Sequence, residues 1–400
     1  MRQNVTKYYT FQFFYALSFA FVPFFVLFMR DRGLSFTEIG LATSIYYFCF
    51  LIFELPTGVI ADKLGRKNTI IVTTILKFIG VVTCLFSYSI YSFIIAEIIL
   101  SMARAMGSGA TNAFLYDSLL YIKEEHQYKR VVGKAYSVHL SGNALSGVLG
   151  ALMLIFFELE YIYIFAAAAA FLAMMVAISF KESLPKLQYK DALNNSIKSY
   201  HGHLIASIRD VLKNKKIIWF ILYASLLFLL IRATLISLQQ PLLIYLKLPK
   251  YYFGLVDTVM SLGAVFFSYY AYWIEKRLGF LITFLIMPII LIISYLGMGL
   301  NTSMIVLIFM FIQLIVIGMY PPIIRDYLNK EIKDSNKRAT ILSVESLVSR
   351  LIFSVYSLFL GVVLDLYSVQ MAMLVTAGVA VVGVVVLFVG REVVKIRIKN

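Results

Sequence analysis

The sequence predicts an all-α polytopic membrane protein, with about twelve transmembrane helices in two pseudo-symmetric six-helix bundles. Composition is the first reason: 61% of the 400 residues are hydrophobic and 14% are charged, whereas charged residues make up about a quarter of a soluble domain. The second reason is that the apolar residues form runs of about 20, the length of a helix that crosses a bilayer. The third is a weak internal repeat between the two halves of the chain.

The helices are expected where these apolar runs occur. The first run follows basic residues but contains no small-residue cleavage site, so we expect a retained span rather than a removed signal peptide. The longest polar interval, 181–216, is expected to be a cytoplasmic linker between a first bundle at 1–180 and a second at 217–400. The predicted spans are, in chain order, 8–28, 37–60, 68–88, 92–121, 131–156, 160–180, 217–246, 251–273, 279–299, 303–328, 339–365 and 368–390.

The internal repeat is visible in residues that limit backbone conformation. Pro23 lies late in the first span and Pro241 late in the seventh, while Gly40 and Gly254 both lie near the start of the following span. Each pair is separated by a little over half the chain, which indicates a parallel repeat. The repeat predicts two bundles that flank one central site.

Basic residues lie at alternate ends of the predicted spans. Most of the 36 Lys and Arg fall in the two tails, in the linker and in the loops on one side of the membrane. The loops on the other side hold Arg30, Arg32, Lys247 and Lys250. By the positive-inside rule both termini are expected in the cytoplasm. The net charge of +15 therefore follows membrane topology, and we expect no nucleic-acid partner.

A charged loop between the second and third spans carries the most specific motif. Gly65 permits a tight backbone turn, and Asp62 and Arg66 are close enough to interact if the stretch is helical. Asp117, at the end of the fourth span, is expected at the same depth as Arg66. The sequence therefore predicts a charge cluster of Asp62, Arg66 and Asp117. The motif residues are Gly58, Asp62, Lys63, Gly65, Arg66 and Lys67.

These residues match the loop pattern Gly-x-x-x-Asp-(Arg/Lys)-x-Gly-(Arg/Lys)-(Arg/Lys), and over nearly its whole length the chain resembles the major facilitator superfamily. Segments 53–57 and 104–119 are similar to bacterial drug-efflux-like members. The resemblance implies alternating access in a bacterial inner membrane. It also implies a gate latch in which Asp62 faces the start of the eleventh span, near residues 338–343, where the helix dipole favours an anion. The alternative is a loop that serves only as a topological anchor.

Charged side chains within spans are costly to bury, so each is a candidate for substrate or proton binding. Glu97 and Arg104 share one face of the fourth span. In the antiporters that the chain resembles, an arginine in this span belongs to a proton relay; the alternative is that the two charges neutralise each other. Arg232 and Gln239 on the seventh span and Asp257 on the eighth form polar stripes. Arg232 with Asp257 is expected to bind substrate or to form a structural ion pair.

Five further polar residues complete the candidate set. Glu54 of the second span and Glu345 of the eleventh are expected either to protonate during transport or to make a gating contact without proton transfer. His139 of the fifth span occupies the repeat position of Glu345 and is titratable, although a helix histidine is more often only hydrogen-bonded. Lys77 and Arg350 fall near mid-depth and add cations there.

The sequence also excludes several classes of site. Cys49 and Cys84 lie within apolar runs and lack metal-ligand spacing, so neither a disulfide framework nor a zinc site is expected. The sequence contains no Walker loop, no zinc-type histidine cluster and no convincing nucleophile with a base. These observations predict a protein that is not an enzyme and needs no cofactor beyond a proton or other ion gradient.

Three functional hypotheses remain. The first is a secondary transporter that exports a small amphipathic or drug-like compound in exchange for protons. The second rests on the mid-depth cations, which suit an anionic metabolite or an acidic lipid headgroup. The third is a non-transporting membrane sensor on the same scaffold. The expected partners are a small-molecule substrate and the lipid bilayer, and the chain is expected to function as a monomer.

Overall fold

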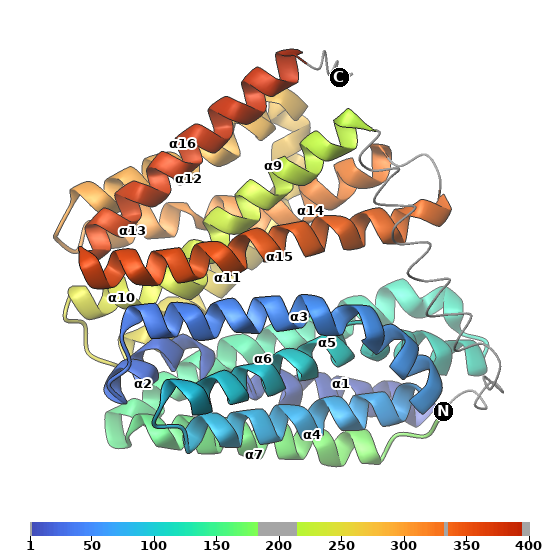
Figure 1. The fold of residues 1–400 in the computed structure, drawn as a ribbon. Helices are drawn as coiled ribbons and strands as arrows, with labels where there is room; N and C mark the ends of the chain where they lie inside the picture. Colours follow the sequence, from blue (N-terminus) through green and yellow to red (C-terminus); the bar gives the residue numbers. More distant parts are fainter. Residues whose placement is uncertain (1, 183–213, 332–334, 394–400) are drawn as a thin grey trace. The chain divides into compact units, whose positions relative to one another are not determined.

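The computed structural model describes residues 2–182, 214–331 and 335–393, apart from the side chains at 55–63, 280, 335–340 and 391–393. Within these ranges 12 helices are long and apolar enough to cross a membrane, and no strand is present (Figure 1). The predicted all-α fold of about twelve spans is therefore confirmed.

The helices of the first sequence half are α1 (Arg2–Leu17), η1 (Val22–Phe24), α2 (Phe25–Asp31), α3 (Phe36–Leu64), α4 (Arg66–Leu85), α5 (Ile90–Tyr121), η2 (Glu125–Gln127), α6 (Tyr128–Phe156) and α7 (Leu159–Ile178). Those of the second half are α9 (Lys215–Arg232), the π-helix η3 (Ala233–Leu238), α10 (Gln239–Tyr245), α11 (Tyr252–Leu278), α12 (Phe280–Leu300), α13 (Val306–Ile312), α14 (Leu314–Glu331), α15 (Ser335–Leu366) and α16 (Val369–Val393).

The chain forms two compact units. Unit 1 holds the described residues of 1–34, 45–199 and 249–258, and unit 2 holds those of 35–44, 200–248 and 259–400. The division falls inside α3, after Ser44, and inside α11, after Thr258. The first part of each of these two helices therefore packs with helices from the other half of the sequence.

Unit 1 is built on α1, which packs against α6 and α7, and on α4, which packs against α5 and α7. Phe180 follows α7, and its ring lies 5.7 Å from that of Phe11 and 4.6 Å from that of Phe114. All three rings are buried. At Gly142 of α6, a Cβ atom would lie 3.0 Å from the Phe13 carbonyl oxygen of α1. Small residues allow this close approach of two membrane helices.

In unit 2, α9 packs against α15 and α12 against α16. The Tyr223 ring of α9 stacks on Trp219 at 5.4 Å and on Phe284 of α12 at 4.6 Å. Pro288 interrupts the hydrogen bonding of α12, because proline has no N–H to donate to the carbonyl four residues earlier. That carbonyl belongs to Phe284, and the Tyr223 hydroxyl donates to it at 2.7 Å. The aromatic contact thus also satisfies a buried main-chain group.

Three spans expected to be continuous helices are interrupted. The first breaks between α1 and η1, the seventh contains the π-helix η3, and the tenth divides at Gln313. Pro23 lies in the first interruption and Pro241 follows the second, where a proline opposes regular helical hydrogen bonding. Near the π-helix, the Tyr295 hydroxyl donates to a main-chain carbonyl of α9 and accepts from Thr234 at 2.7 Å. Side chains thus replace lost helical bonds inside an apolar span.

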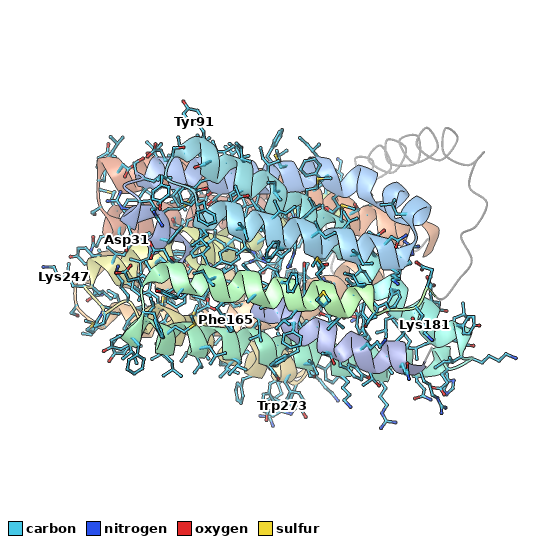
Figure 2. All side chains as sticks on the ribbon, turned by 90° about the horizontal axis from the view of Figure 1, so that it is seen from below. Asp31, Tyr91, Phe165, Lys181, Lys247 and Trp273 are labelled. Atoms are coloured by element: carbon cyan, nitrogen blue, oxygen red, sulfur yellow. The ribbon has the colours of Figure 1, made fainter. Side chains whose placement is uncertain are left out.

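Large aromatic side chains also lie on the surface of each unit. Tyr91 of α5 is 77% exposed and Trp273 of α11 is 50% exposed, and both project away from their helices (Figure 2). Tyr and Trp prefer the border between lipid and water. This placement agrees with helices that cross a bilayer.

Candidate functional site

The motif loop turns at a glycine in a conformation that other residues rarely adopt. Gly65 has φ 83° and directly precedes α4, and the Thr69 hydroxyl donates to its carbonyl at 2.9 Å. Gly279 repeats the arrangement before α12, with φ 77° and the Thr283 hydroxyl at 2.9 Å from its carbonyl oxygen. A positive φ favours glycine. The internal repeat therefore preserves the turn between second and third spans and between eighth and ninth.

Charged side chains gather around this turn in unit 1. The Arg66 Nε atom lies 3.8 Å from the Asp117 carboxylate of α5, as the sequence suggested. Glu182, just after α7, accepts a hydrogen bond from the Lys67 main-chain N–H at 3.2 Å. Partial burial raises the pKa of the Glu182 carboxyl, opposed by hydrogen bonds from the main-chain N–H groups of Lys67 and Arg66. Glu182 thus occupies the N-terminal end of α4, where the helix dipole favours an anion.

Sequence reasoning missed Glu182, although a signal existed. It follows the sixth apolar run directly, so it had to lie on the same membrane side as the motif loop. The described side chains do not include those of residues 55–63, where Gly58, Asp62 and Lys63 lie, or those of residues 335–340. The contact of Asp62 with the start of the eleventh span therefore remains a prediction.

We expect that Glu182→Ala will lower the free energy of unfolding by about 1 kcal/mol, the usual effect of removing a helix N-terminal acceptor. Glu182→Gln should lose less, because its amide oxygen still accepts from Lys67. Thermal unfolding of the purified protein in detergent measures both effects. Glu125→Ala, which removes an acid from the short helix η2, is the control. Equal unfolding midpoints for wild type and Glu182→Ala would exclude the capping role.

The second copy of the motif uses different chemistry. In unit 2 the Tyr327 hydroxyl of α14 donates to the Glu275 carboxylate of α11, and Lys330 pairs with Asp326 at 2.5 Å one turn away. In unit 1 the base comes from the loop and the acid from the neighbouring span; in unit 2 the loop supplies the acid. The two repeats therefore keep the turn but not the charge pattern.

Two cations of unit 1 lie near one aromatic ring at the break in the first span. The Lys77 Nζ atom of α4 lies 3.6 Å from the centroid of the Phe19 ring and 4.8 Å from that of Phe21. The Arg104 guanidinium of α5 lies 5.6 Å from the Phe19 centroid. Lys77 is only 4% exposed, whereas Arg104 is exposed. An exposed arginine in the middle of a 32-residue apolar helix needs a polar environment rather than lipid.

Other polar groups surround this pair of cations. Arg104 interacts electrostatically with the hydroxyls of Tyr15 and Tyr46, and the buried Glu97 carboxyl interacts with Lys77. The His139 ring of α6 lies 6.3 Å from the Tyr15 ring. Its Nδ1 atom has no hydrogen-bond partner among the described residues. The sequence candidates Lys77, Glu97, Arg104 and His139 therefore belong to one polar region of unit 1.

Unit 2 contains a hydrogen-bonded carboxylate. The Ser349 hydroxyl of α15 donates to Glu345 at 3.0 Å, and the Ser225 hydroxyl of α9 lies 2.9 Å from Ser349. Because Ser349 uses its proton toward Glu345, Ser225 is the donor to Ser349. The Tyr320 hydroxyl of α14 lies beside the same carboxylate, and Arg350 one turn along α15 donates to Ser346. Glu345 is thus connected to three helices.

The remaining candidates are less tightly grouped. Arg232 is half-buried at the start of the π-helix, with its guanidinium 5.3 Å from the Phe228 ring centroid. Gln239 follows the π-helix and is buried, and its Oε1 atom has no hydrogen-bond partner in the described part of the chain. Asp257 and Glu54 belong to unit 1, whereas Arg232 and Glu345 belong to unit 2. The pairings Arg232 with Asp257 and Glu54 with Glu345 therefore remain predictions.

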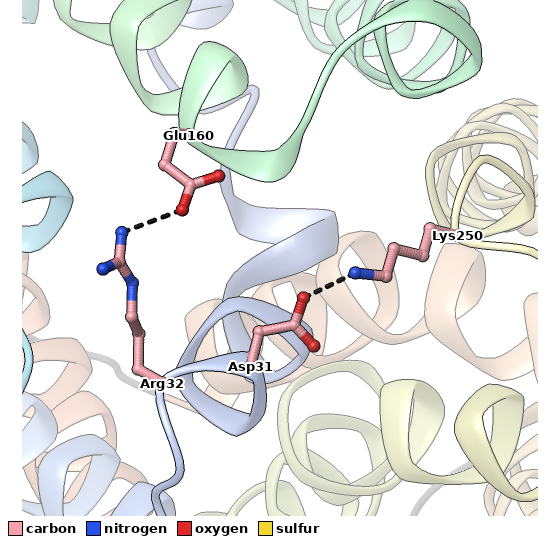
Figure 3. Close-up of polar contacts among 4 residues, drawn as sticks. All are labelled: Asp31, Arg32, Glu160 and Lys250. Carbon is pink, nitrogen blue, oxygen red and sulfur yellow. Dashed lines mark hydrogen bonds and ion pairs between the residues drawn. The ribbon is translucent and has the colours of Figure 1, made fainter.

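The end of unit 1 opposite the motif loop carries a second group of ion pairs, shown in Figure 3. Lys250, just before α11, lies 2.5 Å from the Asp31 carboxylate at the end of α2. Arg32 pairs with Glu160 of α7 at 2.9 Å, and its guanidinium lies 3.9 Å from the Tyr88 ring centroid. Bases predicted for the loops on this side thus hold neighbouring helix ends together.

The fold, the motif turn and the repeat agree with comparisons to known proteins. The sequence profile of the Major Facilitator Superfamily matches residues 9–252, more than half of the chain. The chain belongs to this superfamily. Two relatives, each described as an uncharacterized transporter, come from Buchnera aphidicola of Acyrthosiphon pisum (strain APS) and of Schizaphis graminum (strain Sg).

The similarity to these two relatives covers only part of each chain. The first is 27% identical over 174 residues, 42% of the chain and 43% of the relative. The second is 32% identical over 102 residues, 25% of each. The chain therefore spans less than half the length of either relative.

Solved structures extend the fold assignment to nearly the whole chain. The nucleoside transporter NupG matches with a TM-score of 0.79 at 15% identity. The match covers 96% of the chain and 98% of the NupG chain. A bacterial homologue of the human lysosomal transporter Spinster matches with a TM-score of 0.75 at 14% identity. This match covers 100% of the chain and 98% of the homologue. At these identities the likeness shows the fold alone. The family match makes the chain a major facilitator transporter rather than an enzyme.

Proposed function

We propose that this transporter moves a small solute with an anionic group by alternating access, and that protons drive it. The observation that carries the anionic class is the pair of cations, Lys77 and Arg104, on the Phe19 ring. Like charges repel, and burying an ammonium group costs several kcal/mol unless an opposite charge or a ring face compensates. A bound anion between two such cations would relieve the repulsion.

The position of this cation pair supports a transport role. Phe19 lies at the break of the first span, where main-chain groups are no longer all used in helical bonds. Arg104 is exposed near the middle of α5. Non-helical backbone and charge at mid-depth are tolerated where they line a cavity or bind a solute. The aromatic rings beside the cations favour a solute with an aromatic or apolar part.

The second candidate function is the export of an amphipathic, drug-like compound in exchange for protons. Aromatic side chains around the cations favour it, because ring faces bind cationic and apolar groups of a solute. These side chains are Tyr15, Phe19, Phe21 and Tyr46. The two candidates differ in the charge of the solute. A solute pair that differs only in charge therefore separates them.

Proton coupling is supported by the Glu345 network. Its carboxylate accepts from Ser349 and lies beside Tyr320, and Arg350 and Arg325 interact with it electrostatically. A carboxyl in such a setting can exist with or without its proton at a moderate free-energy difference. Glu345 on α15 is linked to α14 through Tyr320 and to α9 through Ser349 and Ser225, so a change in its charge can alter the packing of these helices.

We expect that benzenesulfonate stabilises the purified protein against thermal unfolding, whereas the cation benzyltrimethylammonium, of similar size, does not. Binding adds about 2.7 kcal/mol of stability at a ligand concentration of 100 Kd. Uptake of benzenesulfonate into liposomes, with and without a pH gradient, then tests transport. Stabilisation by the cation alone would favour the drug-exporter candidate. Stabilisation by either solute without any uptake would favour a sensor.

A further inference from the structure

One side of α6 combines basic residues with exposed leucines. Arg130, Lys134, Ser141, Leu145 and Leu152 follow one another at spacings of four or seven residues, which place them on one side of a helix. All five are exposed, Leu145 to 38% and Leu152 to 50%. The two bases lie in the first two turns of α6 and the leucines in its second half. This stripe is thus charged at one end and apolar at the other.

The stripe is separate from the sides of α6 that pack inside unit 1. Gly142 meets Phe13 of α1, and the Ala144 carbonyl accepts from Thr258 of α11 at 3.3 Å. His139 belongs to the polar region described above. These contacts leave the stripe uncovered. In a helix that crosses a bilayer, an uncovered side with exposed leucines faces lipid.

The two bases at the end of the stripe share an aromatic neighbour on α1. The Lys134 Nζ atom lies 5.1 Å from the centroid of the Tyr9 ring, and Arg130 interacts electrostatically with the Tyr9 hydroxyl. Neither base forms an ion pair with an acid in the described part of the chain. Glu124, which precedes α6, already pairs with Arg2 at 2.6 Å. Two positive charges therefore remain available beside a phenol ring.

A phospholipid carries matching groups in the same order. Its phosphate lies at the border of the bilayer, where Arg and Lys bind phosphate oxygens and tyrosine is enriched. Its acyl chains extend about 15 Å, half the thickness of the hydrocarbon core. Lys134 and Leu145 are 11 residues apart, about 16 Å along a helix. Two bases also favour a headgroup with net negative charge over one that carries an ammonium group.

We propose that Arg130, Lys134 and Tyr9 bind the headgroup of an anionic phospholipid. Both bases donate to its phosphate diester, and an acyl chain of the same lipid lies along Leu145 and Leu152. The lipid belongs to the leaflet on the side of the motif loop, because α6 begins at that end of unit 1. The site lies on a different side of α6 from the polar region of unit 1, so the proposal goes beyond the transport function and is independent of the solute.

A tryptophan placed in the stripe measures lipid selectivity directly. Trp219→Phe and Trp273→Phe remove the two tryptophans of the chain, and Leu145→Trp then supplies a reporter that brominated acyl chains quench in liposomes. Each base near an anionic headgroup contributes about five-fold in affinity. Brominated phosphatidylglycerol should therefore associate at least about five-fold more strongly than brominated phosphatidylcholine. A ratio near one overturns the proposal.

Two double variants show whether particular bases are responsible. Arg130→Gln with Lys134→Gln should bring the quenching ratio close to one. The matched control is Lys276→Gln with Arg277→Gln at the end of α11, where Arg277 lies 3.7 Å from the centroid of another aromatic ring. This control should keep the ratio of the parent. Equal losses in both double variants would mean that only general surface charge attracts the lipid, and the site would be abandoned.

Thermal unfolding in detergent tests the site without a reporter. Dioleoylphosphatidylglycerol should raise the unfolding midpoint of wild type, because a ligand that binds the folded state stabilises it. Phosphatidylcholine and inorganic phosphate should not, and the Arg130→Gln, Lys134→Gln protein should lose the increase. An equal increase with inorganic phosphate assigns the site to a free anion and overturns the lipid assignment. An increase that survives in the double variant does the same. Failure to transport benzenesulfonate affects neither measurement.

Discussion

Lys77→Gln is expected to weaken binding of benzenesulfonate by about 10- to 100-fold and to reduce its uptake accordingly. The reason is that a hydrogen bond to a charged group contributes about 1.5–3 kcal/mol, and each 1.4 kcal/mol changes affinity about tenfold. The substitution removes the repulsion between Lys77 and Arg104 but also the cation beside the buried Glu97 carboxyl, so the unfolding midpoint of the variant is measured without ligand as well. Thermal-shift titration measures the affinity, and liposome uptake measures the rate.

Two further variants make this result specific. Lys77→Arg keeps the charge and the contact with the ring face, and should retain more uptake than Lys77→Gln. Lys134→Gln removes another lysine beside an aromatic ring, 5.1 Å from the Tyr9 centroid, but at an exposed position. Its uptake should equal that of wild type. If Lys77→Gln binds and transports benzenesulfonate normally, Lys77 does not recognise the anion.

Glu345→Gln is expected to separate transport from the pH gradient. The amide still accepts a hydrogen bond from Ser349, but it cannot release a proton, so the coupling charge is lost while the packing is kept. Counterflow of benzenesulfonate between equal concentrations should persist. Accumulation driven by a pH gradient should fall to the level seen without a gradient, which for a coupled transporter is a loss of about 10-fold per pH unit.

The control for this variant is Glu331→Gln, which removes the acid partner of Lys216 in a pair at 2.6 Å and should leave gradient-driven accumulation unchanged. A buried acid that serves only as a structural contact would behave differently from a proton carrier. In that case Glu345→Gln would reduce counterflow and accumulation in the same proportion. Such a result would falsify the coupling role of Glu345.

The candidate site was only partly predictable from the sequence. The cost of placing charge in an apolar span was enough to single out Lys77, Glu97 and Arg104 from residue type and position in the chain. Their arrangement could not be derived that way, because Phe19 is far from all three in sequence and meets the cations only through packing of α1, α4 and α5. For Glu182 the sequence gives the membrane side, since it follows the sixth span, but its contact with Lys67 depends on packing.

Helix interruptions show a second limit of sequence reasoning. A hydropathy pattern measures whether a stretch is apolar enough to cross the bilayer, and a π-helix or a short break leaves that measure unchanged. Pro241 marked the neighbourhood of η3 but not the form of the interruption. Tyr295 and Thr234, which satisfy main-chain and side-chain groups there, come from different helices.

The sequence by itself determined the membrane class, the number of spans, the motif loop and the repeat, because each depends on local composition or on residues adjacent in the chain. Tertiary structure alone decided which cations lie near the Phe19 ring, which acid caps α4, and where α3 and α11 divide between the two units. These features depend on contacts between residues far apart in sequence.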